Sequence, residues 1–355
     1  MASSSGTVLL TGANGFVAAH IVQGLIERNY HIVGTVRSEK KAQDVIALHP
    51  SWKKHITWVY IADIGARGAY DDVFKTGPFD YIIHNASPVD FTVTDYQGAM
   101  VGPAVRGTTA LLQTAQRLGG PLLKRVVLSG STASVFDYFQ PLSKAREPYT
   151  EADWSDVTVK YAIEKNDVVA AYLASKTLAE QGAWKFMETN KPTFDMIVLN
   201  PYVIIGPMLQ PVAGPENVPS TNVFPVLNFL NGTYTDISTL GWPAWHFVDV
   251  RDVARAHILS MTTSAASNKR ILLVSGLVTP QMVINIIRKN FPELHDRVIE
   301  GISEKLIPDG VEPTDWDVRR SYEVFGETWK YIELEKTIVD TVRDVLNHEK
   351  KWASG

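Results

Sequence analysis

The chain has 355 residues, enough to bury a large core as one large domain or two modest ones. Hydrophobic residues make up 45% and charged residues 20%, a globular profile, and a net charge of −4 gives no electrostatic surface for nucleic acid. The absence of cysteine excludes disulfides, thiolate metal sites and a cysteine nucleophile.

The beginning of the sequence lacks the charged and apolar regions of a secretory leader, and no apolar run is long enough to cross a bilayer. The nine histidines do not show the His-Glu-x-x-His spacing of a metal site. We therefore expect a cytoplasmic monomer or homodimer with a small-molecule substrate, and no nucleic acid, membrane or metal partner.

The first predicted element is a short buried strand, Thr7–Leu10, followed by a glycine turn and a helical pattern. Gly12 permits a tight turn, and Gly15 lets the backbone approach a pyrophosphate at the helix N-terminus. The spacing is Gly-x-x-Gly-x-x-Ala, with Ala18 where the usual dinucleotide fingerprint has a third glycine. This context predicts dinucleotide binding; a plain strand-to-helix turn is the alternative.

The end of the second predicted strand, His31–Val36, distinguishes between the two nicotinamide cofactors. An NAD site places Asp or Glu there for the ribose hydroxyls, whereas an NADP site places Arg. Here Arg37 follows the strand, with Lys40 and Lys41 shortly after. Because a guanidinium makes paired hydrogen bonds to phosphate, the position favours NADP over a solvated basic turn.

Further strands alternate with helices and predict an α/β fold, a Rossmann-type doubly wound parallel sheet. The predicted strands are 56–61, 81–84, 125–128 and 194–199, and the predicted helices are 97–118 and 167–187. After the third strand, Asp63 could accept a hydrogen bond from an adenine amino group or cap the next helix. Small residues after the fourth strand, 85–88, allow a ligand to approach closely.

The alternation loosens after residue 205. Strands are predicted at 245–250 and 270–274, and helices at 251–261 and 281–290. We expect residues 1–205, with contributions from about 240–275, to form the nucleotide-binding domain. Residues 206–355 would then form mainly a smaller C-terminal substrate-binding lobe, interleaved with the last strands of the sheet.

The predicted helix 167–187 carries Tyr172 and Lys176, four residues apart and so on one face. An ammonium group favours the phenolate form of a neighbouring tyrosine, so such a pair can give or take a proton. The alternative is a packing tyrosine beside a solvated lysine, which is common on helices.

The position of Ser131 supports a catalytic role for this pair. Ser131 follows the fifth predicted strand, at the edge where open parallel sheets bind ligands. A hydroxyl there could hold a substrate oxygen while Tyr172 protonates it. Its alternative role is a turn or N-cap hydroxyl. We expect the polar segment 137–166 to be a loop over this site.

Taken together, these motifs resemble the extended short-chain dehydrogenase/reductases. Within them the chain is similar to the dihydroflavonol-4-reductase and cinnamoyl-CoA-reductase branch, and especially to fungal NADPH-dependent methylglyoxal/isovaleraldehyde reductases. The motifs are the glycine turn, Arg37, Tyr172-x-x-x-Lys176, and the segments 84–88, 125–131, 200–207 and 249–257.

The resemblance implies a role for individual residues. Ser131, Tyr172 and Lys176 would form a catalytic triad, which is where such enzymes reduce an aldehyde or ketone. The cofactor NADP(H) would be bound by Gly12, Ala13, Asn14, Gly15, Phe16, Val17, Arg37, Lys41, Asp63, Ile64, Ala86, Tyr172, Lys176, Pro201 and Ile204. The substrate pocket would include Val89, Phe91, Thr132 and Tyr202.

One departure concerns position 130, where relatives commonly have a serine before the catalytic one and this chain has glycine. Ser131 still aligns as the catalytic hydroxyl, although Thr132 could share its role. Three alternatives remain open: a hydroxysteroid dehydrogenase, a sugar-nucleotide epimerase, and a non-catalytic NADP sensor. The first two usually retain NAD, against which Arg37 argues, and sensors typically lose the Tyr/Lys pair.

Overall fold

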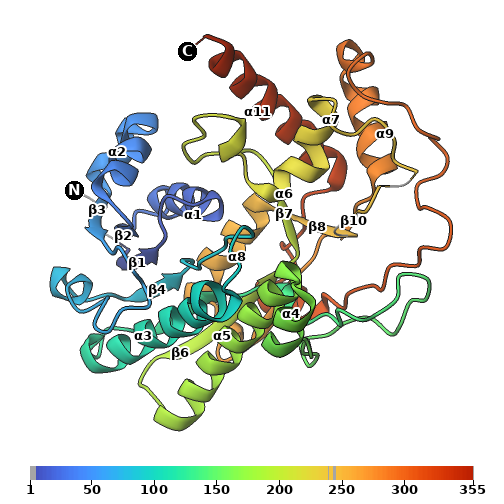
Figure 1. The fold of residues 1–355 in the computed structure, drawn as a ribbon. Helices are drawn as coiled ribbons and strands as arrows, with labels where there is room; N and C mark the ends of the chain where they lie inside the picture. The colour runs from blue at the N-terminus through green and yellow to red at the C-terminus, as the bar shows by residue number, and fades with distance from the viewer. Residues whose placement is uncertain (1–4, 239, 243–244, 355) are drawn as a thin grey trace.

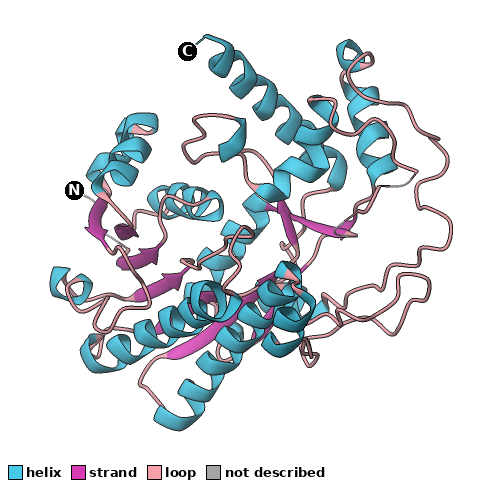
Figure 2. Cartoon of the chain, viewed as in Figure 1, coloured by secondary structure: helices cyan, strands magenta, loops and turns pink. Residues whose placement is uncertain are grey.

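A computed structural model describes residues 5–238, 240–242 and 245–354. Residues 1–4, on which the expectation about a leader partly rests, lie outside this range. The central element is a seven-stranded sheet in the order β3-β2-β1-β4-β5-β6-β9, with every neighbouring pair parallel (Figures 1 and 2). Its strands are β1 (Thr7–Thr11), β2 (His31–Val36), β3 (Ile56–Tyr60), β4 (Tyr81–His84), β5 (Arg125–Ser129), β6 (Asp195–Pro201) and β9 (Arg270–Leu273). The predicted doubly wound fold is confirmed.

Helices cover both faces of this sheet, so all its strands except the edge strand β3 are almost wholly buried. Side chains alternate between the faces, so Leu9 packs in the core under α3 and α5, whereas Val8 and Leu10 pack in the core under α1, α2 and α8. These helices are α1 (Phe16–Glu27), α2 (Glu39–Leu48), α3 (Gly102–Leu118), α5 (Val168–Asn190) and α8 (Val250–Thr262).

A second, smaller lobe surrounds a three-stranded sheet in the order β10-β8-β7. These strands are β7 (Val203–Ile205), β8 (His246–Asp249) and β10 (Gly276–Leu277). The lobe's helices are α6 (Ser220–Asn222), α7 (Asn228–Leu230), α9 (Pro280–Asn290) and α11 (Leu334–Ser354), while α10 (Arg319–Phe325) lies near β9. The chain leaves the large sheet after β6, forms β7 and β8 of the small sheet, and returns to the large sheet at β9. The two lobes are therefore interleaved along the chain.

Three local details differ from the predictions. The segment 137–166 is not all loop, because it ends in α4 (Val159–Lys165), whose N-terminus is capped by the Thr158 hydroxyl. Only Ala162 of α4 is buried, so the helix has almost no apolar periodicity to detect. The predicted helix 97–118 begins as a π-helical turn, and α2 was not predicted.

Two irregular segments from distant parts of the chain run together on one side of the molecule (Figure 1). The backbone N–H of Glu312 donates to the carbonyl of Leu142 (2.6 Å), and Tyr149 forms a parallel bridge with Trp316. The segment between β5 and α4 is therefore held by contacts with the segment that precedes α10. Among the described helices, none has the length and apolar character needed to span a membrane.

Candidate active site

A first cavity, of about 570 Å³, lies at the carboxyl ends of β1 to β4, where the strand order reverses between β1 and β4. The predicted cofactor residues that line it are Gly12, Asn14, Gly15, Arg37, Lys41, Asp63, Ile64 and Ala86. Gly12 has φ +67°, and a Cβ there would lie 3.1 Å from the Ala86 Cα. The turn after β1 can therefore approach β4 this closely only with glycine.

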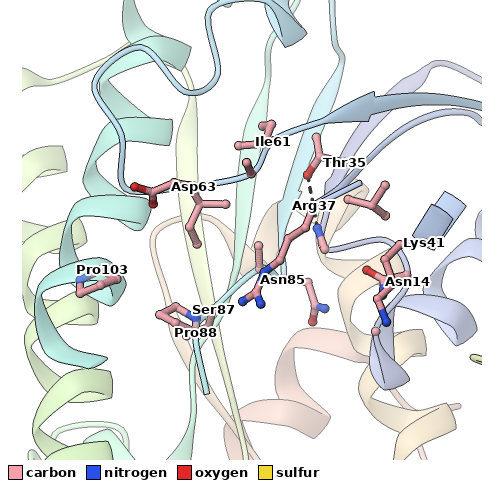
Figure 3. Close-up of a pocket in the computed structure, with 16 residues that line it drawn as sticks. Asn14, Thr35, Arg37, Lys41, Ile61, Asp63, Asn85, Ser87, Pro88 and Pro103 are labelled. Carbon is pink, nitrogen blue, oxygen red and sulfur yellow. Dashed lines mark hydrogen bonds between the residues drawn. The ribbon is translucent and has the colours of Figure 1, made fainter. Parts of the chain in front are cut away.

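The other predicted residues of the glycine turn lie elsewhere. Ala13 is fully buried, and its N–H donates to the Thr35 carbonyl (2.9 Å). Phe16 packs against the core of the smaller lobe, and Val17 lines a second cavity. Thr35, which sequence reasoning missed, also accepts from the Gly12 N–H through its hydroxyl (3.4 Å), the bond drawn in Figure 3.

The first cavity contains two cations that are available to an anion. Within the described residues, the exposed side chains of Arg37 and Lys41 have no ion-pair partner, whereas the neighbouring Lys40 pairs with Asp44 (2.9 Å). In the view of Figure 3, Arg37 lies between Lys41 and Asp63. These positions suit a phosphate, which needs charge-assisted hydrogen bonds.

Asp63 does not cap a helix. Its carboxylate accepts from the N–H of Gly65 (2.8 Å) and so closes a local turn, and the next helical turn starts only at Val73. The second carboxylate oxygen has no described partner, so a contact with an adenine amino group stays a prediction.

A second cavity, of about 530 Å³, adjoins the first, because Asn85 and Ser87 line both. The predicted residues that line it are Val17, Val89, Phe91, Ser131, Thr132, Tyr172, Lys176, Pro201, Tyr202 and Ile204. The structure thus gathers the three proposed catalytic residues, and all four proposed substrate residues, in one cavity.

The Tyr172 and Lys176 pair lies on α5, whose N-terminus is capped by the Asp167 carboxylate through the N–H groups of Val169 (2.9 Å) and Ala170 (3.0 Å). Both side chains are half-buried, and the Lys176 Nζ lies 5.8 Å from the centroid of the Tyr172 ring. The Lys176 Nζ donates to the Ser87 hydroxyl (3.1 Å), a partner that sequence reasoning missed.

The Ser131 hydroxyl accepts from the Ala133 N–H (3.1 Å), so Ser131 is the N-cap of the helical turn that follows it. Accepting one bond leaves the hydroxyl proton and a lone pair for a ligand. Thr132 is buried, and its hydroxyl proton is directed at the Pro201 carbonyl (3.3 Å). This geometry favours Ser131 over Thr132 as the group that meets a substrate.

The walls of the second cavity are mostly apolar. The Phe91 ring lies 5.4 Å from the Tyr172 ring, and burial raises the pKa of Tyr202 to about 12, which keeps it a neutral phenol. Among the described lining residues, Lys176 is the only one with a charged side chain at neutral pH. The smaller lobe adds Ser220, Thr221 and Phe224, which carried no sequence signal.

His257 also lines the second cavity. The sequence did not single it out as a site residue, because it lies on the buried face of α8. Burial lowers its pKa to about 4, so the ring is neutral at pH 7. Its Nε2 lies 2.7 Å from the Ser129 hydroxyl and its Nδ1 lies 2.8 Å from the Val253 carbonyl. Because a carbonyl only accepts, Nδ1 carries the proton and Nε2 accepts from Ser129.

The glycine at position 130 has a steric explanation. A Cβ at this position would lie 2.8 Å from both the Asn200 Nδ2 and the Val198 Cγ1. The side chain of Asn200 therefore occupies the space that a serine at position 130 would need.

Comparison with known proteins shows the family of the chain. Residues 8–275 match the model of the NAD dependent epimerase/dehydratase family, and the chain belongs to that family. Within it, the chain is 30% identical to the NADPH-dependent methylglyoxal reductase GRE2 of Saccharomyces cerevisiae, over 97% of this chain and 99% of that protein. It is 32% identical to the cinnamoyl-CoA reductase CAD2 of Medicago truncatula, over 98% and 97% respectively.

A solved structure gives the same placement. The crystal structure of Gre2 from Candida albicans in complex with NADPH superposes with a TM-score of 0.82, at 31% identity, covering 96% of this chain and 98% of that chain. The predicted place of the chain among the extended short-chain dehydrogenase/reductases, near the fungal carbonyl reductases and the cinnamoyl-CoA reductases, is confirmed.

Proposed function

We propose that the chain is an NADPH-dependent carbonyl reductase that converts an aldehyde or a ketone into an alcohol. The observation that carries this proposal is the Tyr172 and Lys176 pair in an apolar cavity. This cavity adjoins one that contains two cations without an ion-pair partner among the described residues. The residues 1–205, with about 240–275, would bind NADPH, and 206–355 would form most of the substrate-binding lobe.

The first cavity fits NADPH on its own chemistry. A Cβ at Gly12 would fill the space beside Ala86, so the glycine turn leaves backbone free to approach a pyrophosphate. Arg37 and Lys41 supply positive charge where a 2′-phosphate would add negative charge. The relatives that are named as NADPH-dependent support the same cofactor.

When bound, NADPH supplies the hydride for the carbonyl carbon. Tyr172 donates its hydroxyl proton to the carbonyl oxygen, and Lys176 stabilises the phenolate that remains. The Ser131 hydroxyl donates a hydrogen bond to the same oxygen, which orients the carbonyl and stabilises its developing negative charge.

The lining of the second cavity argues against a sugar-nucleotide epimerase. A sugar nucleotide carries a diphosphate, which needs several cationic or N–H partners, whereas Lys176 is the only charged side chain among the described lining residues. A non-catalytic NADP sensor would have no use for a Tyr/Lys pair. A hydroxysteroid is apolar enough for these walls, and a substrate panel distinguishes it from small carbonyl compounds.

The test is to follow NADPH consumption with short aldehydes, α-diketones, aryl ketones, β-keto esters, a dihydroflavonol and a ketosteroid. We expect Tyr172→Phe to lower kcat by about 10²- to 10⁴-fold, the usual contribution of general acid catalysis. NADPH affinity should stay within about twofold, because the phenol is not needed to hold the phosphates. Tyr322→Phe, on the exposed side of α10, is the matched control. Near-normal kcat in Tyr172→Phe would refute the proposal.

A further inference from the structure

A buried ion pair lies one helical turn beyond Lys176 on α5. Glu180 is four residues after Lys176, so its carboxylate projects from the same side of the helix one turn further on. Glu180 is 2% exposed and its partner Arg270, on β9, is 9% exposed. The Arg270 Nε donates to Glu180 Oε1 at 2.7 Å.

The second oxygen of this carboxylate is directed at the turn that carries Ser131. Glu180 Oε2 accepts from the Ser134 hydroxyl (2.6 Å) and from the Asn200 Nδ2 (2.9 Å). The Asn200 Nδ2 also lies 3.0 Å from the backbone carbonyl of Ser131. Asn200 is fully buried at the end of β6, beside Pro201.

The charge of Glu180 fixes the orientation of the Asn200 amide. A carboxylate and a backbone carbonyl are both acceptors only, so the group that faces them must be the NH₂ of Asn200. The opposite orientation would place the amide oxygen against two other oxygens. Asn200 therefore donates to Ser131 in one defined geometry.

The backbone of Ser131 is consequently tied to the helix that carries the Tyr/Lys pair. Its carbonyl also accepts from the Ser134 N–H (3.0 Å) and lies 2.8 Å from the Ser134 hydroxyl. The missing side chain of Gly130 leaves the space in which Asn200 makes this link. A buried ion pair adds little net stability compared with apolar packing, so stability alone does not account for Glu180 and Arg270.

We propose that Asn200, oriented by the Glu180–Arg270 ion pair, is a positioning residue that sets where the Ser131 hydroxyl meets the substrate carbonyl. The proposal rests on the proposed reductase function. Asn200 acts through Ser131 and not on the substrate itself. Since a misplacement of about 1 Å can lower a rate by roughly 100-fold, a buried link of this kind has a measurable effect on turnover.

The test is a double-mutant cycle between Asn200 and Ser131. Asn200→Ala should lower kcat by about 10- to 100-fold while the Kd for NADPH stays within about twofold. If Asn200 works through the Ser131 hydroxyl, the Asn200→Ala change should have almost no further effect on kcat in a Ser131→Ala enzyme. Effects that multiply would overturn the proposal, since a general packing role does not depend on Ser131.

If Asn200→Ala fails to fold, a second variant, Ser134→Ala, can take its place in the double-mutant cycle. Ser134→Ala removes only one hydroxyl, the one that contacts Glu180 and the Ser131 carbonyl, and should lower kcat by about three- to tenfold. That loss should also vanish in the Ser131→Ala background, and its persistence there would overturn the proposal. Thr341→Val, which removes a buried hydroxyl bonded to the Thr337 carbonyl in α11, should leave kcat unchanged.

The outcomes also separate this inference from the proposed function. If Ser131→Ala keeps full turnover while Tyr172→Phe loses it, the reductase assignment stands and the positioning role of Asn200 is refuted. If Tyr172→Phe also keeps full turnover, the reductase assignment itself is refuted.

Discussion

The two adjoining cavities are built in different ways. The first is lined by the ends of four consecutive strands and by Pro103 of α3, all within the first 103 residues. Its distinctive groups are backbone atoms and the cations of Arg37 and Lys41. The second collects residues from Val17 to His257, and its distinctive groups are apolar walls around the ammonium of Lys176. Charge suits the first to a phosphorylated ligand, whereas shape and a few hydrogen bonds suit the second to a neutral one.

The largest expected effect comes from reversing the charge of Arg37 in the first cavity. Arg37→Asp should weaken NADPH binding by about 100-fold, because a charge-assisted hydrogen bond is replaced by repulsion. Binding of NADH should change little, since it lacks the 2′-phosphate. Isothermal titration of both cofactors measures the difference. Lys40→Ala is the control, because Lys40 is paired with Asp44 and lies outside the cavity lining; an equal loss there would remove Arg37 from its proposed role.

Acid stability tests the packing behind the second cavity, where the buried His246 ring contacts Trp316 and the lining residue Tyr202. Burial lowers the pKa of His246 from 6.5 to about 4, and outweighs the nearby Asp315. The unfolded chain therefore binds this proton first, so the stability due to neutral His246 is complete above pH 6.5 and is lost as the pH falls towards 4.

Because phenylalanine cannot take up a proton, His246→Phe should reduce the loss of unfolding free energy between pH 7 and pH 4 by up to about 3 kcal/mol. Urea titrations at both pH values give this difference. His295→Phe, at an exposed position, is the control. An unchanged acid dependence in His246→Phe would show that the ring is not held neutral by burial.

A smaller effect is expected from filling the space at position 130. Gly130→Ser should destabilise the protein by about 2 kcal/mol, the usual cost of overpacking, because its Cβ would lie 2.8 Å from the Asn200 Nδ2 and the Val198 Cγ1. Gly182→Ser on α5 is the control, since the nearest atom to a Cβ there is 3.6 Å away. Thermal unfolding compares them, and equal stability of Gly130→Ser and the parent would contradict the steric explanation.

The smallest effect concerns the exposed edge of the second cavity. Phe91 is 43% exposed and its ring lies 5.4 Å from that of Tyr172. Phe91→Ala should raise KM for an aryl ketone by about three- to tenfold and change KM for a short aldehyde less, because only the larger substrate can reach this ring. Phe139→Ala, at a similarly exposed position outside the lining, is the control. Equal changes in both KM values would mean that Phe91 does not select by size.

Much of the first cavity was predictable because its chemistry lies in short contiguous motifs. A strand, a glycine turn and a helix follow each other within about twenty residues, and Arg37 comes directly after the second strand. Local order of this kind depends on backbone geometry and hydrophobic period, which a sequence displays. The roles of Arg37, Ser131 and Tyr172 are still predictions that the variants above test. The roles of Asp63 and Lys176 also stay predictions.

The sequence by itself determined the doubly wound sheet, its strand–helix order, and the helical spacing that puts Tyr172 and Lys176 on one face. Only the tertiary structure decided that the Ser87 hydroxyl accepts from Lys176, why position 130 is glycine, and that Glu180 and Asn200 reach the Ser131 turn. The physical reason is sequence separation. The side chains of Glu180, Asn200 and Arg270 are hydrogen-bonded in series, and the Asn200 amide also donates to the backbone carbonyl of Ser131. Such bonds leave no periodic trace along the chain, because each depends on how whole elements pack.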